Sequence, residues 1–312
     1  MDHVIEIRGL TKTYKELKAV DNLNLDIKKG RILGLLGPNG SGKSTIINCL
    51  LSLLNFDSGS VKIYKREMTP DSYYIKAKIG VVFQDVGVFE ELSVYENIDY
   101  FCGLYIRDKK ERKKMVQDAI DLVGLNDFKK FRPKQLSGGL LRRLNIACGI
   151  AHKPDIIIFD EPTVAVDPQS RNNILEGIKK LNKKGATIIY TSHYMDEVEE
   201  LCHDIVIIDK GKIIAQGDAE SLKNQIEIQE KISFKAKDLG EDFLSKLRSF
   251  DQVIDLSYDQ ETCKIRFSKG ADKLIKLVKL LKDYDINYDH LSSQRPSLND
   301  VFLELTGKDL RD

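Results

Sequence analysis

The chain has 312 residues, of which 42% are hydrophobic and 31% charged, and its formal net charge is +1. This length favours two domains, because single domains usually hold roughly one to two hundred residues. The balanced composition excludes a disordered chain and argues against a broad surface for nucleic acid, so we expect no nucleic-acid partner. Apolar runs such as Ile156–Phe159 have strand length and fall far short of the roughly 20 residues that span a membrane.

The N-terminal residues 1–6 show no basic segment followed by an apolar one, so we expect no secretion signal and a cytoplasmic protein. The cysteines are odd in number, widely spaced and without a CxxC pair or a histidine at zinc-ligand spacing. We therefore expect a reducing compartment, no structural metal, and small core residues at Cys49, Cys102, Cys148, Cys202 and Cys263.

From Val4 to about Gly217, short β-branched runs alternate with helical stretches, which predicts an α/β domain with a largely parallel sheet. Strands buried on both faces of such a sheet are almost continuously apolar. Runs of this kind are Arg31–Leu36, Ile79–Phe83, Ile156–Asp160, Thr187–Thr191 and Ile205–Asp209. A small antiparallel sheet beside the main one is predicted from Val4–Arg8, Leu23–Ile27 and Val61–Tyr64.

The segment between Gln84 and Leu136 has a helical pattern. Ser93 and Glu96 have capping-box spacing, in which each side chain satisfies a free backbone N–H at a helix start. A basic amphipathic helix is predicted from Asp108 to Val123, with its lysines and arginines on a solvated face. Further along, Asp167 followed by Pro168 predicts a helix start, and Gly185 predicts its end.

After Gly217 the sequence predicts a second, smaller α+β domain. Its elements are a passage from helix to linker that reaches Ile226, strand Ile232–Lys235, helix Glu241–Phe250, hairpin Val253–Phe267 turning near Asp259 and Gln260, helix Asp272–Tyr284, strand Ile286–Leu291 and helix Ser297–Leu305. The β-α-β-β-α-β order is that of the split βαβ, ferredoxin-like arrangement. We therefore expect domains at residues 1–222 and 223–312.

Residues 37–45 match the GxxxxGK[ST] pattern between a predicted strand and a predicted helix. In that setting backbone N–H groups turn inward around phosphate oxygens, and the helix start adds its positive dipole end. Lys43 is expected to reach the β and γ phosphates, and Ser44 to offer its hydroxyl to Mg²⁺. The expected nucleotide-binding residues are Gly37, Pro38, Asn39, Gly40, Ser41, Gly42, Lys43, Ser44 and Thr45; the alternative is a glycine-rich turn without a ligand.

Asp160 and Glu161 are adjacent carboxylates at the end of a predicted buried strand, where a parallel sheet presents its ligand-binding edge. Asp160 is expected to hold Mg²⁺ through water. Glu161 is expected to orient and deprotonate the attacking water as general base. Taken by themselves, the two residues could be ordinary loop carboxylates. The presence of the phosphate-binding loop in the same sequence favours the catalytic interpretation.

A second cradle for an anion is predicted at residues 136–139, Leu-Ser-Gly-Gly, where small residues leave backbone N–H groups open at a helix start. Because the chain has one phosphate-binding loop, the cradle of Ser137, Gly138 and Gly139 is useful if it closes over ATP held by a neighbouring copy. The alternative is a structural loop with paired glycines.

With these motifs in this order, the chain resembles the nucleotide-binding subunits of ATP-binding cassette (ABC) transporters over roughly residues 3 to 220. The matching motifs also include Gln84 after a strand, a D-loop at residues 164–167 and His193 after a strand. The resemblance implies a P-loop NTPase with a RecA-like core, an antiparallel β subdomain and a helical subdomain at about residues 85–137. It further implies ATP hydrolysis with Mg²⁺ by a homodimer or by a pair with another cassette subunit. This dimer would drive an integral-membrane permease from the inner face of the membrane.

By the same resemblance, Gln84 contacts Mg²⁺ and the attacking water, and His193 hydrogen-bonds the γ-phosphate. Tyr14 is similar to the aromatic residue that stacks on adenine, and Asp167 to a residue at the dimer seam. Residue type alone leaves plainer alternatives: a surface amide at Gln84, a packed or solvated His193, an exposed turn residue at Tyr14 and a helix N-cap at Asp167.

Leu140 departs from the family pattern, which commonly has glutamine after the paired glycines. The backbone cradle is unaffected, so we expect ATP to be sandwiched, and the departure puts only a side-chain contact with the nucleotide sugar in doubt. Phe89 and Leu92, apolar residues after Gln84, are candidates for a groove that grips a permease helix.

The tail Arg295–Gly307 is similar to that of cassettes in ABC-2 type exporters of drugs, antibiotics and polysaccharides, and it favours export. The alternative function is a non-transport cassette ATPase that acts as a mechanical switch on ribosomes or DNA. Such relatives usually carry fused cassettes or a long coiled coil, and this sequence has one cassette and no sustained heptads.

Overall fold

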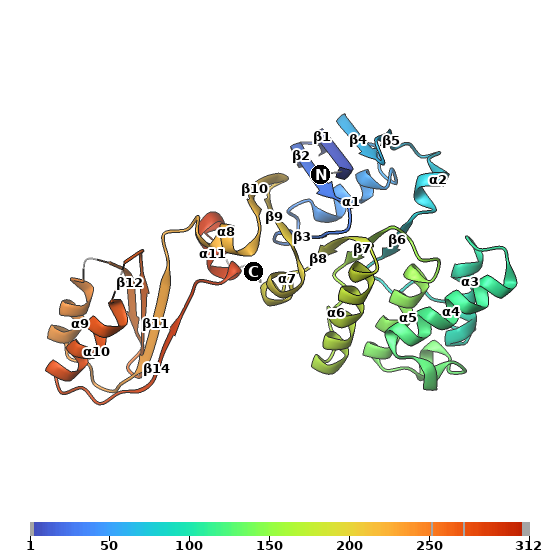
Figure 1. The fold of residues 1–312 in the computed structure, drawn as a ribbon. Coiled ribbons are helices and arrows are strands. Elements are labelled where there is room, and N and C mark those ends of the chain that lie inside the picture. Colours follow the sequence, from blue (N-terminus) through green and yellow to red (C-terminus); the bar gives the residue numbers. More distant parts are fainter. Residues whose placement is uncertain (1–2, 251, 271, 308–312) are drawn as a thin grey trace. The chain divides into compact units, whose positions relative to one another are not determined.

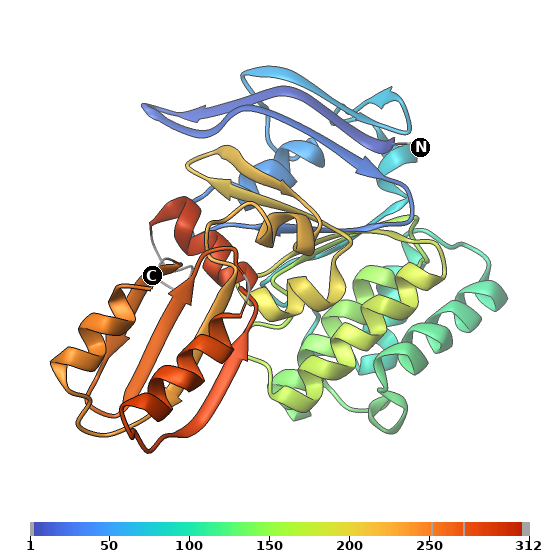
Figure 2. The same cartoon turned by 60° about the vertical axis from the view of Figure 1, so that its left-hand side comes forward.

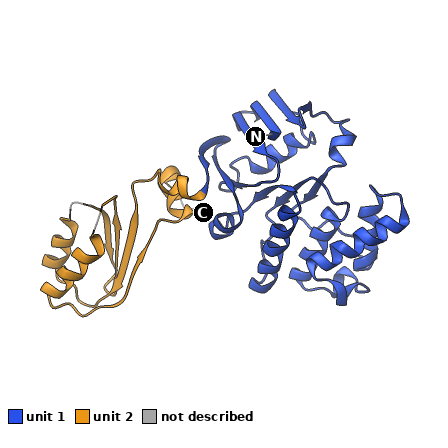
Figure 3. Ribbon diagram, viewed as in Figure 1, with its two compact units in different colours: residues 1–218, 311 blue, residues 219–310, 312 orange. Residues whose placement is uncertain are grey.

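The computed structural model describes residues 3–250, 252–270 and 272–307. They form two units, divided between Asp218 and Ala219 (Figures 1 and 3). The division lies slightly before the boundary at residue 222 that the sequence predicts. The reason is that α8 (Ala219–Lys223) packs against α11 (Leu298–Thr306) and so belongs to the second unit.

The first unit contains a six-stranded sheet in the order β10-β9-β3-β8-β7-β6. The predicted parallel sheet is confirmed by the neighbours of β3, β7 and β8, and every residue of β3 is buried, which explains its continuous apolar sequence. The edge strand β10 was not predicted; it runs antiparallel to β9, and its exposed residues alternate with half-buried ones and the buried Ala215. The strands are β3 (Ile32–Leu36), β6 (Ile79–Val82), β7 (Ile156–Asp160), β8 (Thr187–Thr191), β9 (Asp204–Asp209) and β10 (Lys212–Gly217).

An antiparallel sheet in the order β2-β1-β4-β5 completes the β structure of this unit. Its strands are β1 (His3–Tyr14), β2 (Leu17–Lys28), β4 (Ser58–Ile63) and β5 (Arg66–Glu67). The β1–β2 hairpin is longer than predicted, because polar residues such as Lys12 and Thr13 also pair across it. Residues of both sheets and of α1 (Lys43–Leu50) share one buried cluster that includes Ile5, Ile47 and Ile158.

Helices form the remainder of the first unit (Figures 1 and 2). Ser93 and Glu96 make the predicted capping box of α3, Asp108 caps α4, and Asp167 caps α6. The helix α5 packs against α3, α4, α6 and the strand β6, and so connects the helical region with the parallel sheet. The helices are α2 (Tyr73–Lys76), α3 (Val94–Gly103), α4 (Lys109–Val123), α5 (Gly138–Ile150), α6 (Pro168–Lys183) and α7 (Met195–Leu201).

The second unit has the predicted β-α-β-β-α-β order, with an antiparallel sheet arranged β12-β13-β11-β14. Buried side chains of β11, β13, α9 and α10 form its own core, which includes Phe234, Phe243 and Leu277. Its other elements are β11 (Glu230–Lys235), α9 (Glu241–Arg248), β12 (Val253–Tyr258), β13 (Thr262–Phe267), α10 (Lys273–Asp283) and β14 (Asp289–Gln294).

The strand predicted at Ile286–Leu291 is wrong in position, since β14 begins at Asp289. The N–H of Ile286 donates to the carbonyl oxygen of Leu281 at the end of α10, and its side chain packs on the core. The apolar residue therefore anchors the end of the helix instead of opening the strand.

All the cysteines are free thiols, as predicted; Cys202 is half-buried and the other four are buried. No helix in the described ranges combines the length and apolar character needed to cross a membrane.

Candidate nucleotide site

The predicted phosphate-binding loop joins the buried strand β3 to α1, and its shape depends on glycine. Gly42 has φ of 108°, and a Cβ there would lie 2.3 Å from the carbonyl oxygen of Ala19. A Cβ at Gly37 would lie 2.4 Å from the carbonyl oxygen of Ile208. The helix α1 has no side-chain cap and no acidic residue in its first turn, so its free N–H groups can receive an anion.

Lys43 is the first residue of α1 and is only 7% exposed. Its Nζ donates to the carbonyl oxygens of Gly37 at 2.7 Å and Pro38 at 3.1 Å, so the ammonium lies inside the loop. Burial lowers the pKa of Lys43, and the charges of Glu161 and Asp160 act in the opposite direction. The buried hydroxyl of Ser41 has no hydrogen-bond partner among the described residues, which fits a loop built to receive an oxygen-rich anion.

The predicted carboxylates lie at the end of β7, beside the end of β8. The Thr191 hydroxyl of β8 accepts the N–H of Glu161 at 2.9 Å and donates to Oδ1 of Asp160 at 2.7 Å. Glu161 is 9% exposed and has φ of 49°, in the left-handed region that costs free energy for a residue with a side chain. Its Oε2 lies 3.6 Å from Nδ1 of His193. The structure thus brings the predicted base and the predicted histidine together.

The other predicted site residues lie elsewhere on the first unit. Gln84 follows β6 and is exposed. Ser137 caps α5, with its hydroxyl 3.4 Å from the N–H of Leu140, and Gly138 beside it has open space around it. Tyr14 at the end of β1 is 46% exposed, and the Nζ of Lys12 lies 5.4 Å from its ring centroid. Among the described residues, no hydrogen bond or ion pair joins Ser137 or Tyr14 to the phosphate-binding loop.

A buried carboxylate that the sequence analysis missed connects the segments carrying Glu161 and His193. Glu197 on α7 is 1% exposed. Its Oε2 accepts hydrogen bonds from the hydroxyls of Thr163 at 2.9 Å, Tyr190 at 2.6 Å and Ser192 at 2.9 Å. Burial, together with the charge of Glu197, raises the pKa of Tyr190. The signal available in the sequence was its position among the carboxylates that closely follow His193.

Arg142, on α5, is also buried and was also missed; its contacts join the segments that carry Gln84 and Glu161. An arginine in a mostly apolar helix was the signal available in the sequence, because such a charge is rarely buried without partners.

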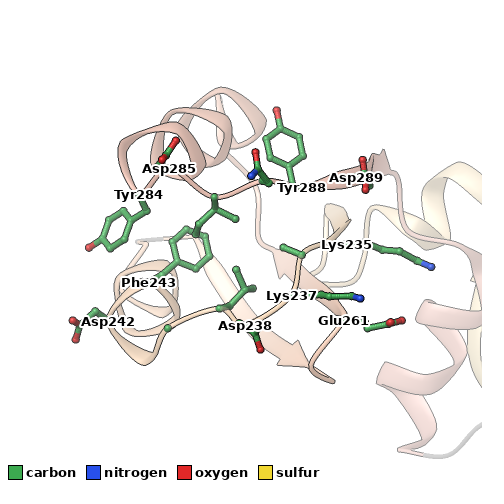
Figure 4. A pocket seen from close by; sticks show the side chains of 15 residues that line it. Lys235, Lys237, Asp238, Asp242, Phe243, Glu261, Tyr284, Asp285, Tyr288 and Asp289 are labelled. Carbon is green, nitrogen blue, oxygen red and sulfur yellow. The ribbon is translucent and has the colours of Figure 1, made fainter.

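A separate cavity of about 910 Å³ lies in the second unit (Figure 4). Its lining combines aromatic side chains such as Phe243 and Tyr284 with lysines such as Lys235 and carboxylates such as Asp289. None of the predicted nucleotide-binding residues contributes to this lining, so the cavity is not part of the candidate nucleotide site.

A glycine-shaped loop that leads from a parallel strand into an uncapped helix, with carboxylates at a nearby strand end, defines a P-loop nucleoside triphosphatase. The sequence profile of the ABC transporter family matches residues 20–164. The chain is 38% identical over 312 residues to the linearmycin resistance ATP-binding protein LnrL of Bacillus subtilis, covering 99% of this chain and 100% of that protein.

The chain is also 32% identical over 314 residues to the Nod factor export ATP-binding protein I of Cupriavidus metallidurans, covering 100% of both. A dimeric post-hydrolysis structure of the ATP-binding cassette MJ0796, bound to ADP and Pi, matches with a TM-score of 0.63 and 31% identity. The match covers 69% of this chain and 98% of that one. The chain belongs to the ATP-binding proteins of the ABC transporter family. This confirms the predicted family, the P-loop ATPase fold and ATP as the nucleotide, and it favours the transport interpretation over a switch on ribosomes or DNA.

Proposed function

We propose that this protein hydrolyses ATP with Mg²⁺ as a head-to-tail dimer and thereby drives export through a separate integral-membrane permease at the inner face of the membrane. Relatives named for linearmycin resistance and for Nod factor export align with the whole chain, which supports the export direction. A homodimer is the simplest assembly, and a pair with another cassette subunit is the second possibility.

The observation that carries the dimer is the second anion cradle. Ser137 and Gly138 are exposed at the start of α5, and open space surrounds Gly138. One chain therefore presents two glycine-rich helix starts, α1 and α5, while it has one phosphate-binding loop. In the head-to-tail arrangement, the Ser137–Gly139 cradle of each copy closes over the ATP held by the other.

The residues at the first cradle fit ATP with Mg²⁺. Residues 37–45 surround the phosphates, with Lys43 on the β and γ phosphates. The oxygen atoms of Ser44, Gln84 and Asp160 would hold Mg²⁺, with Asp160 acting through water. Mg²⁺ prefers oxygen ligands and commonly binds protein oxygens and substrate phosphates at the same time. Mg²⁺ would neutralise charge on the transferred phosphoryl group. Within the described ranges, no group of three or more His, Cys, Asp or Glu could hold a metal ion by itself.

Catalysis is assigned to the edge of the sheet beyond β7 and β8. Glu161 orients the attacking water and accepts its proton, and the Thr191 hydroxyl holds its backbone in the required conformation. His193, near the carboxylate of Glu161, donates a hydrogen bond to the γ-phosphate. Tyr14 stacks on the adenine, since its ring is exposed and has a cation close to one face.

The surface after Gln84 is suited to a permease helix. Phe89 is 42% exposed, and its ring centroid lies 4.9 Å from that of Tyr100, which is 48% exposed. Leu92 is half-buried beside them. Exposed aromatic residues that are grouped in this way mark an interaction surface.

Replacing Glu161 with Gln tests the assigned base and the dimer together. The amide cannot accept the proton, so we expect ATP hydrolysis to stop while ATP binding remains and an ATP-dependent dimer accumulates. Light scattering coupled to size-exclusion chromatography would detect that dimer. The same variant with Gly138→Asp, which places a negative charge in the cradle, should stay monomeric. Normal turnover by Glu161→Gln would refute the base, and an ATP-loaded monomer would refute the dimer.

A further inference from the structure

Arg142 lies on α5, about one turn after the cradle of Ser137–Gly139, and is 4% exposed. Its guanidinium donates only to backbone carbonyl oxygens among the described residues. Nε donates to Pro162 at 2.8 Å, Nη1 to Phe83 at 3.2 Å and to Gln84, and Nη2 to Asp160 at 3.5 Å and to Glu161.

These carbonyl groups come from two segments that are far apart in the sequence. Residues 83–84 follow β6, and residues 160–162 comprise the last residue of β7 and the two residues after it. The guanidinium is planar and carries its five N–H groups in a fixed geometry, so it sets the distance between the two segments. The side chains of Gln84 and Glu161 start from these same segments.

A neighbouring side chain of α5 holds the first segment at another point. Asn145 donates from Nδ2 to the carbonyl oxygen of Phe83 at 3.2 Å and accepts the N–H of Gly87 at 3.1 Å. The next arginine, Arg143, has different contacts: its Nη1 donates to the carbonyl oxygens of Val123 at 3.1 Å and Gly124 at 3.4 Å, at the end of α4. The helix therefore offers a test residue and a control side by side.

We infer that Arg142 is a positioning residue that couples occupancy of the Ser137–Gly139 cradle to Gln84 and Glu161 of the same chain. The inference rests on the proposed function, in which the cradle binds the ATP of the partner while Gln84 and Glu161 act on the chain's own ATP. A helix moves as a rigid element, so a shift of its first turn moves Arg142 and both catalytic segments with it. The two ATP sites of the dimer are thereby linked through α5.

The experiment compares Arg142→Lys and Arg142→Gln with Arg143→Lys in the full-length protein. Lysine keeps the charge but cannot bridge two segments, because it has one ammonium group in place of the planar fork. We expect Arg142→Lys to keep ATP affinity and ATP-dependent dimerisation in the Glu161→Gln background. Its kcat should fall by roughly 10²-fold, the effect of a catalytic group displaced by about 1 Å. The Hill coefficient for ATP should fall to about one, while Arg143→Lys keeps the wild-type value.

A double-mutant cycle separates positioning from plain stabilisation. If Arg142 acts through Gln84, adding Arg142→Lys to Gln84→Ala should lower kcat far less than it does in the wild type. If the effects of Arg142→Lys and Gln84→Ala on kcat simply multiplied, so that their activation free energies added, that result would overturn the inference. So would losses of ATP affinity and melting temperature in proportion to kcat, an unchanged kcat in Arg142→Lys, or an equal effect of Arg143→Lys.

A further measurement leaves Arg142 intact and applies even if its variants do not fold. In a mixed dimer, one copy carries Glu161→Gln and Gly138→Asp, and the other carries Glu161→Gln alone. With ATP bound, hydrogen exchange of residues 83–87 and 160–163 should stay fast in the copy with the blocked cradle and slow down in the other. Equal protection in both copies would overturn the coupling. If instead the wild type neither hydrolyses ATP nor dimerises with it, the proposed function itself has failed.

Discussion

Single residues at the nucleotide site meet several demands at once. Glu161 has a left-handed backbone, its N–H is held by Thr191, and its carboxylate lies near His193. Strain of this kind persists only where surrounding contacts hold it in place. Here the contacts come from β8 and from Arg142, which binds the carbonyl oxygen of Glu161. The position of the proposed base is therefore set by residues from other elements.

His152 shows how burial of one side chain can make stability depend on pH. It is 8% exposed, and its ring stacks on Tyr105 with centroids 3.9 Å apart. Burial lowers the pKa of His152 to about 4 from the ordinary 6.5. The contribution of the neutral His152 to the free energy of unfolding is full above about pH 6.5 and is lost as the pH falls toward about 4. The reason is that the unfolded chain binds the proton at a higher pH than the folded chain does. The loss amounts to about 3 kcal/mol at most.

In the wild type, the free energy of unfolding should fall between about pH 7 and about pH 4.5, which lie on either side of the ordinary histidine pKa. We expect His152→Phe, which keeps a stacking ring, to remove a large part of this fall. Urea unfolding at several pH values measures it. A His152→Phe protein with the wild-type pH slope would show that this imidazole does not remain neutral in the fold.

The start of α5 combines two glycines that the structure treats differently. A Cβ at Gly138 meets nothing within 4 Å, whereas a Cβ at Gly139 would lie 2.4 Å from Oγ of Ser170 and 2.8 Å from Oδ2 of Asp167. Gly139 is thus required by the packing of α5 against the start of α6. Gly138 is free of such contacts and faces the place where we expect the partner's ATP.

From this difference we expect Gly138→Ala to fold like the wild type and to lose most ATP hydrolysis, because its methyl group occupies space needed by the phosphates. Gly139→Ala should lower the unfolding free energy by about 1–3 kcal/mol through overpacking. Melting temperature and ATPase rate, measured on both variants, distinguish the two effects. A Gly138→Ala protein with full ATPase activity would remove the second cradle from the mechanism.

At the scale of the whole molecule, the comparisons divide the chain as the structure does. The cassette structure of MJ0796 covers 69% of the chain, while LnrL and the Nod factor export protein align along its full length. The second unit has its own core and follows the cassette in the sequence. The resistance and export proteins align with this unit as well as with the cassette. All residues of the candidate nucleotide site lie in the first unit.

The proposed partnership with a permease makes a prediction for the intact protein in its native membrane. Affinity purification of the tagged chain should recover a multi-spanning membrane protein. Phe89→Asp should reduce that recovery, since it places a charge on the exposed aromatic surface, and it should leave the ATPase activity of the isolated dimer unchanged. Ile275 is 68% exposed on the second unit, so Ile275→Asp is a control expected to have no effect. Recovery of ribosomes or DNA instead would overturn the transport function.

Local sequence patterns determined much of this protein. The glycine loop at residues 37–45, the continuous strand β3, the caps at Ser93 and Asp167, and the β-α-β-β-α-β order all follow from residues within a few positions of one another. Such features are encoded in backbone conformation, capping and periodicity, which act over one or two turns. They were sufficient to predict the family and the identity of the proposed site residues.

Only the tertiary structure decided which residues position that site. Arg142 meets carbonyl groups of residues 83–84 and 160–162, and Glu197 accepts hydrogen bonds from three hydroxyls of two segments; no local pattern contains such pairings. The length of the β1–β2 hairpin and the start of β14 likewise depend on strand partners and core contacts. The physical reason is that a buried charge or an edge strand is stabilised by groups distant in the chain, which become neighbours only when the sheets and helices pack.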